Sequence, residues 1–232
     1  MDFALFTGEG FAFFCRWLHF FFGVIWIGLL YYFNFVQGSF MAETDGPTKS
    51  QVLQKLAPRA LWWFRHSAMA TFTTGWLIIA YRAHSAPGIL NTSWGVSILT
   101  GATFGSLMWA NVWFVIWPMQ KVVIQNAVDV AGGKPANPDA ANRAARALVT
   151  SRTNVMFSIP MLFFMGAASH LPILMDGDSK IMPFAVVIGT ILVAAQANAL
   201  KGKTGPLTTV RGVITSGFVL TAIVYVTMEL LL

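Results

Sequence analysis

Six long apolar stretches account for most of this 232-residue chain. A helix needs about 20 mainly apolar residues to cross the hydrocarbon core of a bilayer. We expect spanning helices at Phe11–Val36, Ala60–Ala83, Trp94–Trp117, Asn154–Met175, Ile181–Leu200 and Gly212–Leu232. The sequence therefore predicts an all-α integral membrane protein, a bundle of about six transmembrane helices that forms a single polytopic domain over residues 1–232.

The composition supports this class and excludes others. Charged residues make up 10% of the chain, whereas soluble domains carry about 25%. Aromatic residues make up 14%, as expected for interfacial belts and packed membrane helices. Cys15 is the single cysteine, which excludes an internal disulfide and a Cys-x-x-Cys-His site for covalent haem. The net charge of +6 lies mainly in short loops between the spans, so we expect no nucleic-acid partner.

The distribution of Lys and Arg predicts the orientation. Twelve lie in the first, third and fifth loops or at the adjoining helix ends, and three lie on the other side: Arg16, Arg82 and Lys180. Basic loops stay in the cytoplasm, so we expect both termini to be periplasmic in a multi-pass protein of the bacterial inner (cytoplasmic) membrane. The loop 119–152 becomes a long cytoplasmic loop, in which 140–148 predicts a short amphipathic surface helix. The first stretch is too long for the apolar core of a signal peptide, and we expect it to be retained.

Two histidines fall within the expected spans. Ionisable groups inside a membrane are costly and mark functional sites. His19 lies about 12 Å along the first span from its periplasmic start, and His170 lies roughly 9 Å from the periplasmic end of the fourth, at 1.5 Å per residue. His84 ends the second span on the same side. The sequence therefore places three imidazoles in the periplasmic half of the bundle.

The neighbours of these histidines favour a flat, anionic cofactor. Gly23 and Gly166 lie four residues from His19 and His170, on the same helix faces, and leave gaps beside each imidazole. Facing imidazoles are a common means of holding b-type haem in a helical bundle. Arg16 and Arg82 supply positive charge for its propionates on the same side. We therefore expect haem b, with the iron ligands among His19, His170 and His84.

Other interpretations remain open at this stage. The imidazoles can hold another metal, or they can simply hydrogen-bond to neighbouring helices, where small residues such as glycine are common in any case. His84 alone is more typical of an interfacial residue than of a ligand. The spans lack the charged residues, broken-helix pairs and repeats that are typical of transporters.

Several segments of the chain resemble the membrane domain of PuuD-type urate hydroxylases, the bacterial integral-membrane urate oxidases. The matching segments are Arg16–His19, Gly23–Gln37, Pro58–Arg65, Asn111–Lys121 and Asn154–Pro172. They cover most of the first four spans, in order. The first span is also similar in style to the small HemJ-like haem proteins of membranes, a more distant analogy.

The resemblance implies a helical membrane bundle that oxidises urate, or a similar small reductant, to 5-hydroxyisourate and delivers the electrons to a cytochrome c. Members of that family typically carry the cytochrome as a C-terminal domain, which we do not expect in a chain with Cys15 alone and an end at Leu232. A separate periplasmic or membrane-bound cytochrome c then becomes the expected partner. The alternative is a non-catalytic haem-binding or structural subunit of a larger respiratory electron-transfer complex, with other subunits of that complex as partners. No catalytic residue can be assigned.

Overall fold

The computed structural model describes residues 3–175 and 180–232, and this part of the chain is helical without strands. The α-helices are α1 (Gly8–Tyr31), α2 (Gly38–Glu43), α3 (Gly46–Gln51), α4 (Ala57–Ser85), α5 (Ser93–Asn111), α6 (Trp117–Ala131), α7 (Ala140–His170), α8 (Ile181–Lys201) and α9 (Val210–Leu231). Three π-helical segments, η2 (Tyr32–Gln37), η3 (Val52–Leu56) and η5 (Val112–Ile116), lie between them. Short 3-10 turns, η1 (Ala4–Phe6), η4 (Ile89–Asn91) and η6 (Gly205–Thr208), complete the order.

The π segments join neighbouring α-helices into long continuous rods. One rod runs through Gly8–Glu43 and another through Ser93–Ala131. In η5 the N–H of Trp117 donates to the carbonyl of Val112, five residues back. Pro118 follows directly and has no N–H for the carbonyl four residues before it, so the wider turn accommodates a proline that would otherwise break the helix. The same arrangement precedes Pro58 in α4.

The expected loop 119–152 is mainly helical, which corrects the sequence interpretation. α6 extends the rod that begins at Ser93 as far as Ala131, and α7 begins at Ala140, so that only residues 132–139 connect them without a helix. The expected short surface helix at 140–148 is the first part of α7 and not a separate element. The interpretation failed because Pro118 was taken as a helix end, although the π turn before it lets the helix continue.

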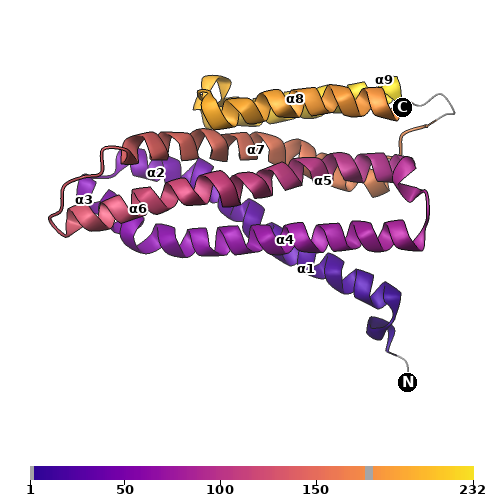
Figure 1. The fold of residues 1–232 in the computed structure, drawn as a ribbon, viewed down its shortest axis with the longest axis horizontal. Helices are drawn as coiled ribbons and strands as arrows, with labels where there is room; N and C mark the ends of the chain where they lie inside the picture. Colours follow the sequence, from indigo (N-terminus) through magenta and orange to yellow (C-terminus); the bar gives the residue numbers. More distant parts are fainter. Residues whose placement is uncertain (1–2, 176–179) are drawn as a thin grey trace.

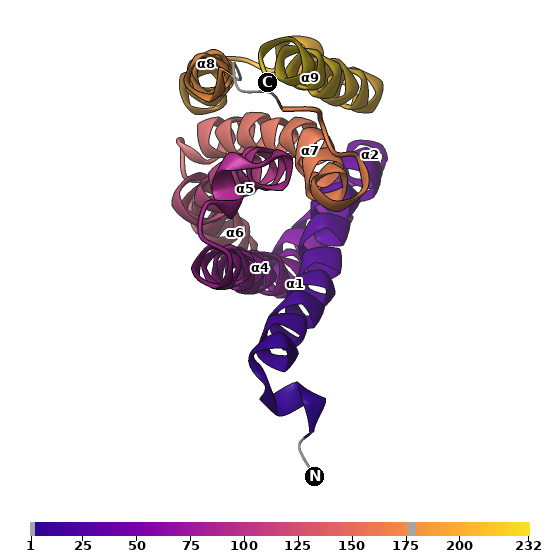
Figure 2. The same cartoon turned by 90° about the vertical axis from the view of Figure 1, so that its right-hand side faces the viewer.

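The helices form two layers. In Figures 1 and 2, α1, α4, α5 and α7 run side by side around a central space, and α8 with α9 lies as a second layer over α7. Within the first layer the closest pairs are α1 with α4 and α5 with α7. Both chain termini lie at the same end of the molecule, which we call the terminal end (Figure 1). The opposite end, with α2, α3 and the 132–139 connection, is the loop end.

Five segments are long and apolar enough to span a membrane, as in a multi-pass membrane protein: Gly8–Glu43, Ser93–Ala131, Ala140–His170, Ile181–Lys201 and Val210–Leu231. The sixth expected span lies in α4, which is not among them. Its interior carries Ser67, Thr71 and Thr74, which lower its hydropathy. Each of these hydroxyls donates to a backbone carbonyl of the preceding turn, at 2.6–2.8 Å, so α4 buries them without loss of hydrogen bonding.

A buried amide cluster ties the two layers together. Asn111 of α5 donates to Asn154 of α7 at 2.8 Å and exchanges two hydrogen bonds with Gln196 of α8, at 3.1 and 2.5 Å. Asn154 in turn donates to the carbonyl of Met108 at 3.0 Å. Asn111 and Asn154 are fully buried, and their amides are satisfied only while α5, α7 and α8 keep this register.

Candidate functional site

A cavity of about 850 Å³ lies among α1, α4, α5 and α7, in the half of the bundle toward the terminal end. Volumes of roughly 300–1,000 Å³ are typical of sites for small molecules and cofactors. Six of the seven residues predicted from the sequence line this one cavity: Arg16, His19, Gly23, Arg82, Gly166 and His170. The structure therefore brings together residues that are up to 154 positions apart in the chain.

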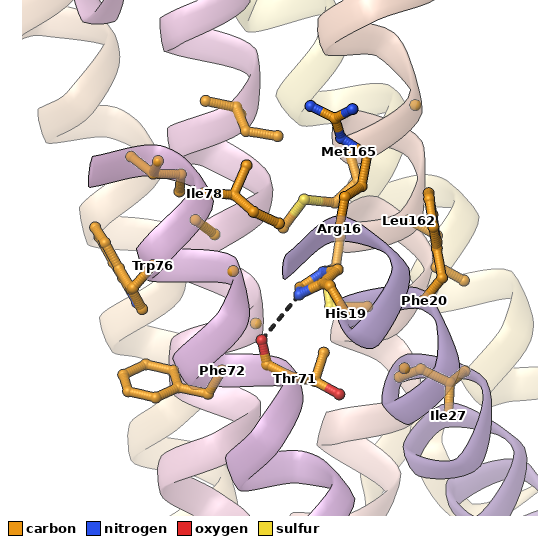
Figure 3. Close-up of a pocket in the computed structure, with 18 of the residues that line it drawn as sticks. Arg16, His19, Phe20, Ile27, Thr71, Phe72, Trp76, Ile78, Leu162 and Met165 are labelled. Carbon is orange, nitrogen blue, oxygen red and sulfur yellow. Dashed lines mark hydrogen bonds between the residues drawn. The ribbon is translucent and has the colours of Figure 1, made fainter. Parts of the chain in front are cut away.

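His19 is held in a defined orientation by α4. Its Nδ1 lies 2.9 Å from the backbone carbonyl oxygen of Thr71 and 3.3 Å from the hydroxyl of Thr74 (Figure 3). A carbonyl only accepts, so Nδ1 carries the proton in a neutral imidazole, and Nε2 keeps its lone pair. No other residue in the described part of the chain hydrogen-bonds to Nε2. This pairing of one imidazole nitrogen with a carbonyl is the arrangement that orients metal-ligating histidines in proteins.

The His19 ring rests directly on Gly75 of α4. A Cβ atom at position 75 would lie 2.9 Å from Cε1 and 3.2 Å from Nδ1 of His19, closer than such atoms approach. Gly75 therefore provides the space into which the ring fits. Among the other glycines of the cavity, Gly166 and Gly28 would place a Cβ in open space, and Gly23 would meet only the Thr71 methyl at 3.8 Å. A side chain at position 166 would thus enter open space, whereas one at position 23 would contact Thr71.

Positive charge borders the cavity at the terminal end. Arg16 and Arg82 are both exposed and both line the cavity, and the Arg82 guanidinium lies 5.6 Å from the Trp94 ring centre. Among residues 3–175 and 180–232, the lining contains no Asp or Glu. The described part of the rim therefore presents two cations to an anionic group.

The other two predicted ligands are less constrained. His170 is the last residue of α7, is exposed, and has no hydrogen-bond partner within residues 3–175 and 180–232. His84 lies near the end of α4, is exposed, and is not among the residues that line the cavity. In the same described residues, no three His, Cys, Asp or Glu side chains gather as around a metal ion. The cavity thus offers two imidazoles, and the structure does not bring His84 to them.

Sequence reasoning missed the wall that α4 and α5 contribute. Thr71, Gly75 and Trp76 of α4 and Ser106 of α5 all line the cavity. Met161 of α7 also lines it while being only 7% exposed. The small and polar Thr-x-x-Thr-Gly run from Thr71 to Gly75 was the available signal, because such residues mark a helix face that is approached closely by another helix.

Fold and site together define an all-α protein with membrane-length apolar helices around a cavity that presents imidazole and guanidinium groups. Comparison with known families identifies a more specific relationship: the urate oxidase N-terminal family matches residues 89–228, more than half of the chain. The chain belongs to this urate-oxidase-related family. The match covers α5, α6, α7, α8 and most of α9, including Gly166 and His170, and leaves Arg16, His19 and Arg82 outside it. No curated protein and no solved structure matches the chain.

Proposed function

We propose that this chain is a haem b-binding redox protein of the bacterial inner membrane, related to the PuuD-type urate hydroxylases. In this proposal it oxidises urate, or a similar small reductant, and passes electrons to a periplasmic or membrane-bound cytochrome c. Membership of the urate-oxidase-related family supports the substrate class. The observation that carries the cofactor assignment is His19, which lines the cavity. Its Nδ1 is bound to the Thr71 carbonyl, and its Nε2 has no hydrogen-bond partner among the described residues.

The residues of the cavity fit the chemistry of a haem. A neutral imidazole nitrogen is the usual axial ligand of b-type haem iron, and His19 and His170 each present one at the cavity. Gly23 and Gly166 leave room for a flat macrocycle beside the imidazoles. Arg16 and Arg82 match two propionates in charge and in number. When bound, the haem would supply one-electron redox chemistry.

The chain's own groups would prepare the site for this reaction. The Thr71 carbonyl accepts the hydrogen bond from Nδ1 of His19 and so fixes the orientation of the ring. Converting urate to 5-hydroxyisourate adds the oxygen of one water molecule and releases two electrons and two protons. The position of the cavity near the terminal end suits delivery of electrons to a partner on that side of the membrane.

The test is the absorption spectrum of the purified chain in detergent or nanodiscs. The expected result is a b-type spectrum that changes to the reduced form when urate is added. His19→Ala and His170→Ala should each weaken or shift this spectrum. His66→Ala is the matched control, because His66 also binds a carbonyl through Nδ1, that of Trp62 at 2.7 Å, but lies outside the cavity. A spectrum that ignores urate would reject the substrate, and a colourless wild-type protein would reject the cofactor.

A non-catalytic role as a haem-binding or structural subunit of a larger respiratory complex is the second candidate. Large aromatic side chains of α1 and α4, among them Trp17, Trp62 and Trp63, are exposed and suit either lipid or partner helices. Stable co-purification with oxidase or cytochrome subunits, together with urate oxidation that requires those subunits, would favour this role. Urate oxidation by the isolated chain with added cytochrome c would exclude it.

A further inference from the structure

The cavity has an opening on one side of the bundle, between α1 and α7. Toward the loop end these helices are tied together, because Tyr31 bonds to Ser158 at 2.8 Å and Asn34 donates to Ser151 at 2.8 Å. Toward the terminal end, no hydrogen bond within the described residues joins α1 to α7. The hydrogen bonds between α1 and α7 in the described residues therefore lie only on the loop-end side of the cavity.

On the opposite side of the cavity, side-chain contacts join α4 to α5. Between α4 and α5, the Trp76 indole donates to the Ser106 hydroxyl at 3.2 Å. Beside it the Phe72 and Trp109 rings stack with centres 4.1 Å apart. Figure 3 shows Phe20 of α1 and Leu162 of α7 on the side of the cavity away from Trp76. These contacts bridge α4 and α5, whereas no hydrogen bond within the described residues joins α1 to α7 at this end.

Three apolar residues mark the edge of this opening, which we call the lateral mouth: Phe20, Val24 and Leu162. Each lines the cavity and is also exposed on the outside of the bundle, by 65%, 74% and 49% respectively. Gly28 and Gly166, also exposed, add no side chain that could block it. In a membrane these apolar edges would face lipid acyl chains, so a ligand could enter the cavity from within the bilayer.

The chemistry inside the lateral mouth favours an uncharged, flat head group. The cation Arg16 lies eight residues from Val24 along α1, roughly 12 Å toward the terminal end at the helical rise. At the depth of Val24 the cavity wall contains the aromatic rings of Trp26 and Phe72 and no charged group on these helices. A fatty-acid carboxylate or a lipid phosphate would be poorly solvated there, whereas a conjugated ring could stack and accept hydrogen bonds through its oxygens.

We propose that the lateral mouth is a binding site for an isoprenoid quinone, with the ring inside the cavity and the isoprenoid tail leaving between Val24 and Leu162. The site requires that the bundle lies in a membrane, but it does not require haem. It therefore goes beyond the function proposed above and connects the cavity directly to the membrane's pool of lipid-soluble electron carriers.

The experiment uses the full chain in nanodiscs of phosphatidylethanolamine and phosphatidylglycerol that contain an azido-ubiquinone photolabel. We expect the label on peptides around Val24 and Leu162, and displacement by excess ubiquinone but not by oleate. Val24→Trp should reduce labelling about tenfold by filling the mouth. Val193→Trp on α8 is the matched control, since Val193 is 70% exposed and lies outside the cavity, and it should label normally.

Three results would overturn the proposal: absence of label, equal labelling of α8 and α9, or equal displacement by oleate. If Val24→Trp fails to fold, Leu162→Trp and the peptide map of the wild-type chain still decide the question. The readout is independent of the absorption spectrum. A haem spectrum without labelling would reject the quinone site alone, and labelling without haem would reject the cofactor alone.

Discussion

At the scale of single residues, the most informative arrangement is the contact of His19 with Thr71 and Gly75 of α4. A backbone carbonyl cannot change its protonation, so the Thr71 carbonyl fixes the tautomer of His19 more firmly than a titratable partner would. The Thr71 carbonyl already lies within an α-helix, and its additional contact with His19 needs a close approach of α1 and α4. Gly75 permits that approach because it has no side chain beneath the ring.

Replacing Gly75 should therefore damage the protein through His19. We expect Gly75→Ala to lower the free energy of unfolding by about 1–3 kcal/mol, the usual cost of overpacking, because its Cβ would lie 2.9 Å from Cε1 of His19. The measurement is thermal unfolding in detergent, followed by circular dichroism. Gly28→Ala is the control, since Gly28 also lines the cavity but its Cβ would meet no atom within 4 Å.

A double substitution identifies the cause. In a His19→Ala background the ring is gone, and Gly75→Ala should then cost much less than in the wild-type chain. An equal loss of unfolding free energy in both backgrounds would show that Gly75 is needed for α4 itself and not for the position of His19.

The sequence predicted part of this site for physical reasons that also explain its limits. His19, Gly23 and Arg16 could be placed on one helix face, because residues three or four apart share a face. Thr71 and Gly75 could not be assigned to His19, because their contact depends on how α4 is rotated and shifted against α1. His84 was grouped with the other histidines by depth alone, and at the end of α4 it is exposed and lies outside the cavity lining.

At the scale of elements, the π turns explain why helix ends were harder to predict than helices. Every expected span corresponds to a helix in the structure, since long apolar runs carry a strong signal. Proline is a weaker guide, because a single wide turn lets the chain pass through Pro118 into α6. The amide cluster is likewise invisible to apolar periodicity, although Asn111, Asn154 and Gln196 decide how α8 is fixed to α5 and α7.

The amide cluster gives a prediction for the docking of α8. Asn111→Leu should lower the free energy of unfolding by about 1–3 kcal/mol, because Gln196 loses both hydrogen bonds and stays partly buried. Gln196→Leu should cost a similar amount, and the double variant less than the sum of the two, as measured by denaturant unfolding in detergent. Asn142→Leu, at an exposed position of α7, should have little effect. Additive losses for the two cluster variants would contradict the proposed coupling.

At the scale of the whole molecule, the two layers have different tasks. The cavity is built by α1, α4, α5 and α7 alone, and α8 with α9 supports it from behind α7. The expected membrane orientation rests on the contrast between twelve basic residues near the loop end and three near the terminal end. Two of the twelve are held by backbone carbonyls, because Arg146 donates to the carbonyls of Ala199 and Gly202, and Arg152 donates to those of Leu207 and Thr208.

Even without those two arginines, ten basic residues remain against three, and this excess still predicts that the loop end stays in the cytoplasm. The buried Cys15 is first replaced by Ala, so that the only thiol is the one introduced at an exposed position. A membrane-impermeant maleimide added to spheroplasts of a bacterial host should then label Ser85→Cys, at the terminal end. It should reach Lys134→Cys, at the loop end, only after the membrane is permeabilised. Labelling in the reverse order would show the opposite orientation. The rim at Arg16 and Arg82 would then face the cytoplasm, where a periplasmic cytochrome could not accept electrons from this site.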